Sequence, residues 1–459
     1  MSETIAVLGG GPAGLGAALA LGQQDRDVVL FEAGPRLGGL AASLEVGGQR
    51  VDIGSHRLHP STSPHTLRLL RGLLGDDLQK RTRNGRIRLF DRWLGFPLTG
   101  SDLVRSLPPT FLARAGASAA RAAVRPTSDA TFADYVTTGL GAVMGEEFYF
   151  PYARKMWGIE PDQIAGEQAR RRISAGSPAK LAKKIWSGGN TSAGFDYFYY
   201  PAGGFGRLCE ALAAECERVG VDIRLEEPVQ RLSETPTGYD VESLQSKLPA
   251  GTVLSTVPLP ILNQALGRPP SLSHLSYRAM IVVYVVVAAA QYTPFDAHYL
   301  PGAYTPITRI SEPKNYRTPT KNWPDPTDVT VLCAELPCDP SDPIWRASDH
   351  DLQQVVAQTL ARSGLPAAQI VDTTVLRKRQ AYPIYPLDFR AQLEPTLEFL
   401  QRQRRLLTFG RQGLFAHDNT HHALDMAWAA ASVVNADGTI RGAEWSRFLE
   451  RFAAHVVSD

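Results

Sequence analysis

Ile5–Ala6–Val7–Leu8–Gly9–Gly10–Gly11–Pro12–Ala13–Gly14 opens the chain, and Val28–Val29–Leu30–Phe31–Glu32 follows after the length of one helix. The order is an apolar strand, a glycine-rich turn, an Ala/Leu-rich helix over residues 12–22, and a second strand that ends in an acid. Glycines alone also make ordinary turns, but this order around them is the fingerprint of a β-α-β unit that binds a dinucleotide. The opening stretch therefore predicts a nucleotide-binding domain.

Each glycine of this fingerprint has its own expected task. Gly9 would allow the tight turn, Gly11 would let the backbone approach a pyrophosphate, and Gly14 would let the helix pack against the strand. The helix that begins near Pro12 directs its partial positive charge at the phosphates. Glu32 stands 18 residues after Gly14, where its carboxylate can bind a ribose diol.

The next segment indicates which dinucleotide is bound. Glu32–Ala33–Gly34–Pro35–Arg36–Leu37–Gly38–Gly39–Leu40–Ala41–Ala42–Ser43 resembles the second glycine motif of the glutathione-reductase-type flavoproteins. In that group the motif follows the ribose acid and lines the FAD pyrophosphate, whereas NAD dehydrogenases generally lack it. A plain turn at Gly38 and Gly39 is the alternative, but its place directly after the acid favours FAD.

Length and composition exclude several other classes of protein. The chain has 459 residues, which is long for one core, and we expect two or three domains. A net charge of +2 does not favour nucleic acid or an anionic membrane as a partner. The longest apolar run, residues 280–290, is shorter than the roughly 20 residues of a membrane span and predicts a buried strand. We therefore expect no nucleic-acid partner and no integral membrane segment.

The cysteines and the start of the chain bear on its compartment. Cys209, Cys216, Cys333 and Cys338 form no CxxC motif, and reduced cysteines of a cytoplasmic protein are the simplest interpretation. The first expected strand begins near Thr4, so we expect no secretory signal. Cytoplasmic localisation is the prediction, and the sequence does not indicate an oligomeric state.

The pattern along the chain alternates between two kinds of segment. Residues 1–56, 195–262 and 370–459 are predicted to form a Rossmann-like α/β domain of the glutathione-reductase type that binds FAD. Residues 57–194 and 263–369 are predicted to form an interleaved α+β domain that caps the flavin and selects the substrate. The clearest individual elements are a hairpin over 86–97, a helix over 207–218, a strand within 280–290 and a helix over 421–434.

The last of these helices has a possible second role beside packing. Asp418, Asn419 and Thr420 offer N-caps for it. Its amino end would then carry a partial positive charge close to the flavin. That field would stabilise the negative charge of a reduced flavin by roughly 0.3–1 kcal/mol, whereas an ordinary capped helix packed on the sheet is the alternative.

Taken together, these motifs resemble the FAD-dependent protoporphyrinogen-oxidase-like proteins of the flavin amine oxidase superfamily, in the branch near UDP-galactopyranose mutase. The resemblance runs along essentially the whole chain, through residues 52–60, 149–158, 305–315, 381–385 and 410–411. It implies that residues 52–60 form the loop beside the flavin ring. The implied cofactor contacts are those of the fingerprint, Gly9, Gly11, Pro12, Ala13, Gly14 and Glu32, joined by Ala33, Gly38, Gly39, Leu40, Gly54, Ser55, His56, Val229, Gly410 and Arg411.

Three residues are the candidates for catalysis. His56 and His59 lie three apart in the loop expected beside the flavin, and a histidine can transfer a proton near neutral pH. The alternative for each is a loop histidine bonded to backbone. Arg309 is the best candidate for an anion-binding residue because a guanidinium binds phosphate or carboxylate with two hydrogen bonds. The alternative for Arg309 is a salt bridge to Glu312.

Other side chains give weaker signals for a substrate or a metal. Arg172 is a second candidate for contact with an anion, although a run of arginines is usually a solvated face. Trp157 and Tyr385 would wall the substrate pocket, unless they belong to the core. A metal centre is considered at four residues close in sequence and is not predicted, because flavin chemistry needs none and such clusters are common on helix surfaces; they are His417, His421, His422 and Asp425.

The function predicted from the sequence is that of an FAD-dependent oxidoreductase. A small polar or anionic metabolite would transfer a hydride to the flavin, and the protein would orient it and exclude water. The alternative is a redox-neutral mutase or isomerase that acts on a nucleotide sugar. A flavin-binding scaffold without activity is a third interpretation.

Overall fold

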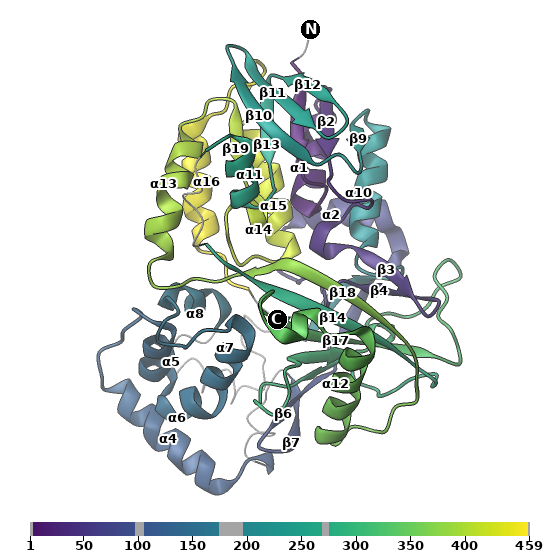
Figure 1. The fold of residues 1–459 in the computed structure, drawn as a ribbon, viewed down its shortest axis with the longest axis vertical. Helices are drawn as coiled ribbons and strands as arrows, with labels where there is room; N and C mark the ends of the chain where they lie inside the picture. Colours follow the sequence, from purple (N-terminus) through teal and green to yellow (C-terminus); the bar gives the residue numbers. More distant parts are fainter. Residues whose placement is uncertain (1–2, 97–104, 174–195, 269–274, 458–459) are drawn as a thin grey trace.

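The computed structural model describes residues 3–96, 105–173, 196–268 and 275–457. A parallel sheet of five strands, in the order β19-β13-β1-β2-β9, forms the upper part of the molecule in Figure 1. Its strands come from distant parts of the chain, because the chain leaves this sheet after a strand and later returns to it. They are β1 (Ile5–Leu8), β2 (Val28–Phe31), β9 (Asp222–Arg224), β13 (Thr252–Ser255) and β19 (Leu406–Thr408).

Successive side chains of a β-strand point to opposite faces of the sheet, so those of β1 lie in two separate cores. On one face, Ile5 and Val7 of β1 pack in a cluster with residues of α1 (Pro12–Gly22), α10 (Arg207–Arg218) and α15 (Thr420–Ser432). On the other face, Ala6 and Leu8 pack against α11, α13 and an antiparallel meander. These elements are α11 (Leu259–Ala265), α13 (Phe389–Gln401), β10 (Val229–Thr235), β11 (Gly238–Ser243) and β12 (Lys247–Ala250). The parallel sheet is thus covered on both faces, as its apolar strands require.

A mixed sheet of seven strands lies below the parallel sheet in Figure 1, in the order β18-β14-β17-β16-β15-β6-β7. One face of β14, the second strand in this order, packs against α12 (Asp349–Arg362), and the other packs against the hairpin of β3 and β4. The strands of this region are β3 (Ser43–Val46), β4 (Gln49–Asp52), β6 (Gly85–Leu89), β7 (Arg92–Phe96), β14 (Tyr277–Val287), β15 (Ala297–Tyr299), β16 (Arg309–Ser311), β17 (Thr330–Cys338) and β18 (Ile370–Pro383).

A group of helices flanks the seven-stranded sheet at the lower left of Figure 1. It contains α4 (Pro109–Ala123), α5 (Phe132–Leu140), α6 (Ala142–Met144), α7 (Phe150–Trp157) and α8 (Gly166–Arg172). The remaining elements join the two sheets or cover the parallel one. They are α2 (Pro64–Leu74), β5 (Leu78–Thr82), β8 (Tyr197–Pro201), α14 (Gly410–Gly413) and α16 (Gly442–Ala453).

Most elements lie where the sequence predicts them, with three differences. The helix expected over 421–434 begins one residue earlier, after Asn419, and ends at Ser432. The Val-rich strand begins at Tyr277 because the residues before the apolar run pair with β18. The sequence pattern assigns residues 370–383 to the nucleotide-binding segments, whereas as β18 they pair with β14 in the seven-stranded sheet. Residue 97 of the expected hairpin and residues 174–194 of the expected cap lie outside the described residues.

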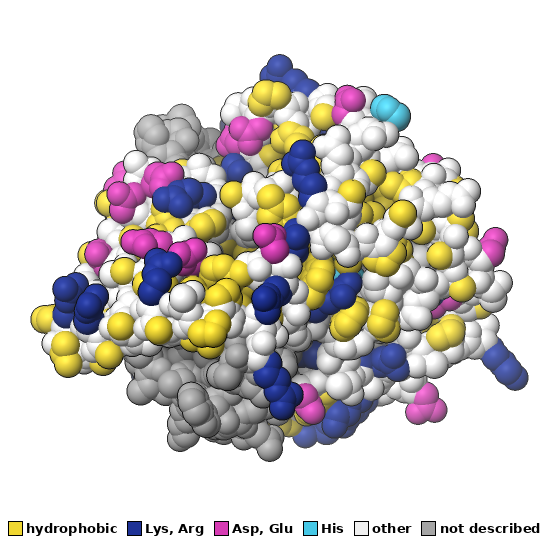
Figure 2. Space-filling view, turned by 90° about the horizontal axis from the view of Figure 1, so that it is seen from below, with side chains coloured by type: hydrophobic (Ala, Val, Ile, Leu, Met, Phe, Trp, Pro, Cys, Tyr) yellow, Lys and Arg dark blue, Asp and Glu magenta, His cyan; other side chains and the backbone are white. Residues whose placement is uncertain are grey.

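The surface and the cysteines add two observations. Seen from below, basic and acidic side chains of the described residues are interspersed with apolar ones over the face in Figure 2. The cysteines Cys209, Cys216, Cys333 and Cys338 are all buried and free. Within the described ranges, none of the helices combines the length and the apolar character needed to cross a membrane.

Candidate functional site

A cavity of about 580 Å³ opens at the carboxyl ends of β1, β2 and β13 and reaches β16 and β18 of the seven-stranded sheet. Ligands of open α/β sheets bind at this edge, and the volume falls in the range of roughly 300–1,000 Å³ typical of small-molecule sites. Many of the residues predicted to bind cofactor or substrate line it. They are Gly9, Gly11, Pro12, Ala13, Glu32, Ala33, Gly39, Leu40, Ser55, His56, His59, Val229, Arg309, Gly410 and Arg411.

The glycine-rich turn between β1 and α1 has two different constraints. A Cβ added at Gly14 would lie only 1.8 Å from the carbonyl oxygen of Gly9, so helix and turn can approach only without a side chain there. A Cβ added at Gly11 would meet no atom within 4 Å. Gly11 borders the cavity itself, and the absence of a side chain there leaves room for a ligand rather than for the protein.

Glu32, at the end of β2, is held by backbone donors. Its carboxylate accepts hydrogen bonds of 2.8 Å from the N–H groups of Gly10 and Gly34. The second glycine loop is joined to the first by the N–H of Gly38, which donates to the carbonyl of Gly10 at 2.8 Å. The two loops thus form one wall of the cavity with an oriented carboxylate on it.

Asp52 anchors the loop that was expected to pass the flavin ring. Its buried carboxylate accepts hydrogen bonds from Ser43 Oγ at 2.7 Å, from the hydroxyl of Tyr200 at 2.6 Å and from the N–H of Phe205 at 2.8 Å. Burial raises the pKa of Asp52, although these hydrogen bonds act in the opposite direction. Farther along the loop, the imidazole of His56 stacks on Phe205 with the ring centroids 5.2 Å apart. The loop is therefore fixed where it lines the cavity.

Arg309 lines the cavity and forms an ion pair, but its partner is Glu335 rather than Glu312. Its Nη2 lies 2.8 and 2.9 Å from the two carboxylate oxygens of Glu335. The reason is register, because Arg309 on β16 and Glu335 on β17 are direct cross-strand partners. Glu312 instead accepts hydrogen bonds from the N–H groups of Tyr292 and Thr293. The same Glu335 accepts the N–H of Ser55 at 2.8 Å, so this ion pair also positions the cavity loop.

The amino end of α15 forms another part of the cavity wall. Asp418, Asn419, Thr420 and Ala423 line the cavity there, and Asn419 is the N-cap residue. At the glycine-rich turn, the amino end of α1 also lines the cavity, through Pro12. The helix dipoles give both places a partial positive charge. The cavity is therefore suited to a ligand that carries negative charge.

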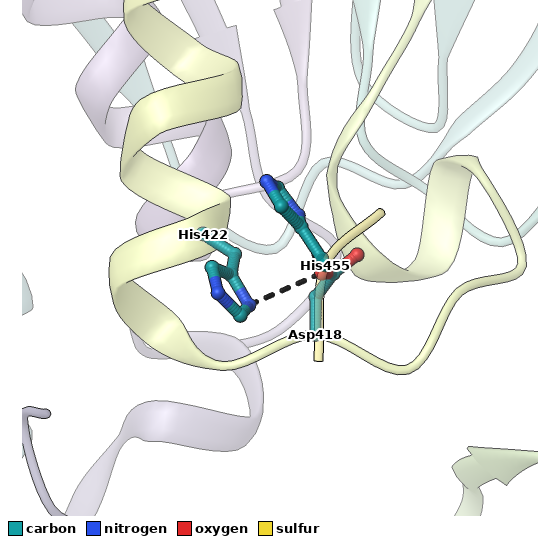
Figure 3. A group of neighbouring side chains, drawn as sticks. All are labelled: Asp418, His422 and His455. Carbon is teal, nitrogen blue, oxygen red and sulfur yellow. Dashed lines mark hydrogen bonds and ion pairs between the residues drawn. The ribbon is translucent and has the colours of Figure 1, made fainter. Parts of the chain in front are cut away.

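Asp418, His422 and His455 form a compact group behind this helix end (Figure 3). One carboxylate oxygen of Asp418 lies 2.8 Å from His455 Nδ1 and 3.2 Å from His422 Nδ1. Burial acts to raise the pKa of Asp418, but the contacts with both imidazoles outweigh it and hold the pKa below its ordinary value. The atoms are close enough for a metal ion to bridge them. Their direct contacts already account for that closeness, and we assign them no metal.

Two of the residues expected to bind substrate lie in the core instead. Trp157 is buried at the end of α7, where its ring meets that of Phe132 at 5.3 Å. Tyr385 is buried against Phe389, and its hydroxyl donates to the carbonyl of Phe415 at 2.8 Å. Both are large apolar rings in sequence contexts that also suit a core, so the sequence alone could not separate the two roles.

Arg172, which like Arg309 was expected to bind substrate, lies over an aromatic ring near the cavity wall. Its guanidinium carbon is 5.6 Å from the ring centroid of Tyr382, and that of Arg411 is 5.0 Å from the same centroid. Burial and the nearby Glu335 raise the pKa of Tyr382, while Arg309, Arg172 and Arg411 act to lower it. These three arginines, far apart in sequence, therefore converge on one phenol.

Several residues that line the cavity were not singled out by the sequence. Thr256 directly follows β13 and lines the cavity. Its position at the carboxyl end of a parallel strand could have identified it as a cavity residue. Lys378, Arg379 and Gln380 reach the cavity only because β18 pairs with β14. That pairing joins segments about a hundred residues apart and leaves no local signal.

The chemistry of this cavity fits FAD. The open side of Gly11 and two helix ends provide room and positive potential for a pyrophosphate. The carboxylate of Glu32 lies at the end of β2, where the ribose of a dinucleotide is bound in this type of fold. Residues Gly9, Gly11, Glu32, Gly39 and Gly410 would hold the cofactor along this wall, and the loop with His56 would lie beside its ring.

Comparisons with known proteins agree with this interpretation. The family model described as flavin containing amine oxidoreductase matches residues 12–432. The coproporphyrinogen III oxidase of Mycobacterium bovis is 24% identical over 423 residues, which cover 85% of this chain and 90% of that protein. A Mycobacterium tuberculosis protein with the provisional name flavin-containing monoamine oxidase AofH is 25% identical over 272 residues, or 55% of this chain. The chain spans about half, 56%, of the length of that relative.

A solved structure shows the same fold. The structure of reduced UDP-galactopyranose mutase matches 95% of this chain and 94% of its own, with a TM-score of 0.78 at 19% sequence identity. The FAD-binding α/β fold predicted from the sequence is confirmed by these matches.

Proposed function

This chain belongs to the flavin containing amine oxidoreductase family, and from that premise we propose that it oxidises an anionic metabolite by hydride transfer to FAD. The family assignment makes it an FAD-dependent oxidoreductase. The proposal concerns the finer question of what it oxidises. We further propose that the seven-stranded sheet and helices α4–α8 form the side of the molecule that selects the substrate.

The observation that carries this proposal is the convergence of arginines on Tyr382. The guanidiniums of Arg172 and Arg411 both lie over the ring, and Arg309 contributes to the same electrostatic environment. Glu335 neutralises Arg309 in part, since it holds that guanidinium through two oxygens. Arg172 and Arg411 leave a surplus of positive charge beside the phenol, which favours a carboxylate or phosphate over an ammonium ion.

The residues around the cavity would carry out the remaining tasks of the reaction. FAD, when bound, supplies the acceptor of the hydride. The amino end of α15 would stabilise negative charge at the ring through the helix dipole. His56 and His59 would hold or donate a proton beside the ring. The loop anchored by Asp52 would orient the substrate and exclude water from it.

Anaerobic mixing tests the proposed substrate class. The holoprotein is mixed with coproporphyrinogen III, which bears carboxylates, and separately with benzylamine, which is a cation. We expect the carboxylate compound to bleach the oxidised flavin and the amine to leave it unchanged. Bleaching by benzylamine but not by coproporphyrinogen III would contradict an anionic substrate.

A redox-neutral mutase is the second candidate, favoured by the overall likeness to the mutase structure and by the histidines of the cavity loop. Such an enzyme would act on a nucleotide sugar only after reduction of its flavin, and it would return no electrons. UDP-galactopyranose is therefore added to oxidised and to dithionite-reduced holoprotein. Conversion to a furanose by the reduced form alone would favour the mutase over the oxidoreductase.

A further inference from the structure

Lys378 places a cation in the part of the cavity wall that the seven-stranded sheet contributes. It lies on β18, the edge strand of that sheet, which runs directly below the parallel sheet in Figure 1. Gly11, Glu32 and Gly39 of the two glycine loops line the same cavity. The ammonium group thus borders the expected site of FAD, although it comes from the other sheet.

The pairing of β18 with β14 determines which way Lys378 points. Its cross-strand partner is Met280, which packs in one cluster with the hairpin of β3 and β4. Cross-strand partners point to the same face of a sheet. Arg377, one residue earlier, points to the opposite face and donates to the carbonyl of Trp345 at 2.9 Å, on the side of α12. Lys378 therefore lies on the face of the sheet that α12 does not cover.

The backbone after Lys378 is bound to the segment that follows the last strand of the parallel sheet. Gln412 Nε2 donates to the carbonyl of Gln380 at 2.9 Å, and Arg411 Nη2 donates to the carbonyl of Ala381 at 2.7 Å. Both donors belong to α14, which comes directly after β19. The position of Lys378 is therefore fixed through the backbone, without a bond from its own side chain.

The ammonium group itself has no partner within the described ranges of the chain. No hydrogen bond or ion pair joins Lys378 to another of these residues. Two arginines of the same cavity differ in this respect, since Arg57 forms an ion pair with Asp296 and Arg309 forms one with Glu335. Lys378 is thus a cation of the cavity that the described residues do not neutralise.

The surroundings of Lys378 make its charge costly. Burial is the main cause that lowers its pKa, Arg36 acts in the same direction, and Glu32 acts in the opposite one. A partly buried charge is unfavourable unless an opposite charge accompanies it, and a bound anion would supply that charge. The influence of Glu32 and Arg36 also shows that the ammonium group lies in the field of the expected ribose acid and its loop.

From this placement we propose that Lys378 binds the diphosphate of FAD, so that the seven-stranded sheet takes part in holding the cofactor. A lysine binds phosphate as a compact point charge. The field of Glu32 favours the cofactor over the substrate as the source of the anion, because we assign the substrate to the arginines around Tyr382. This inference depends on FAD as the cofactor and not on the identity of the substrate.

Fluorescence titration of the full-length apoprotein with FAD tests this role. Lys378→Met keeps an unbranched side chain and removes its charge, so the Kd for FAD should rise roughly tenfold to a hundredfold, as for one lost charge-assisted hydrogen bond. The Kd for ADP, which carries the diphosphate but no flavin, is measured by competition and should rise by a similar factor. Lys378→Arg keeps the charge and should stay within about threefold of the wild type.

The melting temperature of the apoprotein separates a binding role from a structural one. Lys378→Met should leave it unchanged or raise it, because the substitution removes an unpaired, partly buried charge. Arg377→Met is the matched control on the opposite face of the same strand. It loses the hydrogen bonds to the carbonyls of Trp345 and Ala347, so it should lower the melting temperature and leave both Kd values unchanged.

Three results would overturn this inference, and each points to a different role. An unchanged Kd for FAD together with a higher half-saturating concentration of substrate in Lys378→Met would assign the ammonium group to the substrate. Weaker binding of FAD with unchanged binding of ADP would place its contact on the flavin part. A melting temperature lowered as far as in Arg377→Met, with unchanged Kd values, would make Lys378 a structural residue.

Discussion

At the scale of single residues, Gly11 and Gly14 lie in one turn but face different surroundings. Gly14 is in contact with the protein, since a Cβ there would collide with the carbonyl of Gly9. Gly11 borders the cavity, where a Cβ would meet no protein atom. Gly14 is therefore required for folding and Gly11 for the ligand, although both belong to the same sequence fingerprint.

Alanine substitutions at these two glycines should separate cofactor affinity from stability. Gly11→Ala should leave the melting temperature of the apoprotein within about 2 °C and weaken FAD binding at least tenfold, because the new methyl group occupies ligand space. Gly14→Ala should destabilise the apoprotein by several kcal/mol, since overlap with the Gly9 carbonyl forces the backbone to move. Differential scanning calorimetry and flavin fluorescence titration measure the two effects. Equal loss of stability in both variants would contradict this division.

Glu32 allows a second test at the residue scale. Glu32→Gln keeps the size of the side chain but removes its charge, and it places an amide N–H₂ near the N–H of Gly10 or Gly34. A charge-assisted hydrogen bond is worth about 1.5–3 kcal/mol, so the Kd for FAD should rise roughly tenfold to a hundredfold. Glu45→Gln, at an exposed position of strand β3, is the control. An unchanged Kd in Glu32→Gln would exclude the carboxylate as a ribose ligand.

At the scale of elements, α15 joins the cavity to the segment between the loop and α2. Its amino end lines the cavity, while one face holds residues 61–66 through His421, Asp425 and Trp428. This arrangement couples the position of His59 to the packing of a helix from the far end of the chain. The helix and its start were predicted from the capping residues, which are local signals, but its partners are not local.

Removal of the Asp425 carboxylate should loosen that junction. Asp425→Ala deletes the acceptor of Ser63 Oγ at 2.9 Å and Thr66 Oγ1 at 3.3 Å. We expect the free energy of unfolding to fall by about 1–3 kcal/mol, with faster hydrogen exchange at the amides of residues 61–67. Glu398→Ala breaks only an exposed ion pair on α13 and should change stability by less than about 0.5 kcal/mol. Equal effects of the two substitutions would count against this role of Asp425.

The strands and helices could be predicted where their signals are local, and the site only in part. The fingerprint from Ile5 to Glu32 combines apolar runs, glycines and one acid within a single β-α-β unit, and it appears as expected. The partner of Arg309 depends on the register of β16 and β17, which a single sequence does not specify. The place of Tyr382 beside Arg172 and Arg411 likewise depends on packing between distant segments.

At the scale of the whole molecule, buried histidines link stability to pH. Burial is the main cause that lowers the pKa of His298 to about 3 and that of His421 to about 2. Both are therefore neutral in the folded protein, while in the unfolded chain each takes up a proton near its ordinary value of about 6.5. Because the unfolded state binds more protons between pH 3 and 6.5, stability must fall as the pH decreases through this window.

His298→Gln should flatten this dependence. Each such histidine contributes up to about 1.4 kcal/mol of lost stability for each pH unit below 6.5. The loss of unfolding free energy between pH 7 and pH 5, measured with urea, should thus be about 1–2 kcal/mol smaller in His298→Gln than in the wild type. His350→Gln, at an exposed position, should leave the slope unchanged. A wild-type slope in His298→Gln would mean that His298 is already protonated in the folded state.

The most direct test of the proposed reaction is the rate of flavin reduction by coproporphyrinogen III under anaerobic conditions, followed by stopped-flow absorbance over a range of concentrations. The account predicts that Arg172→Gln raises the half-saturating concentration roughly tenfold to a hundredfold, the equivalent of one charge-assisted hydrogen bond, with little change in the limiting rate. Arg154→Gln, exposed on α7, should behave like the wild type. The same concentration dependence in Arg172→Gln and the wild type would contradict the claim that these arginines bind the substrate.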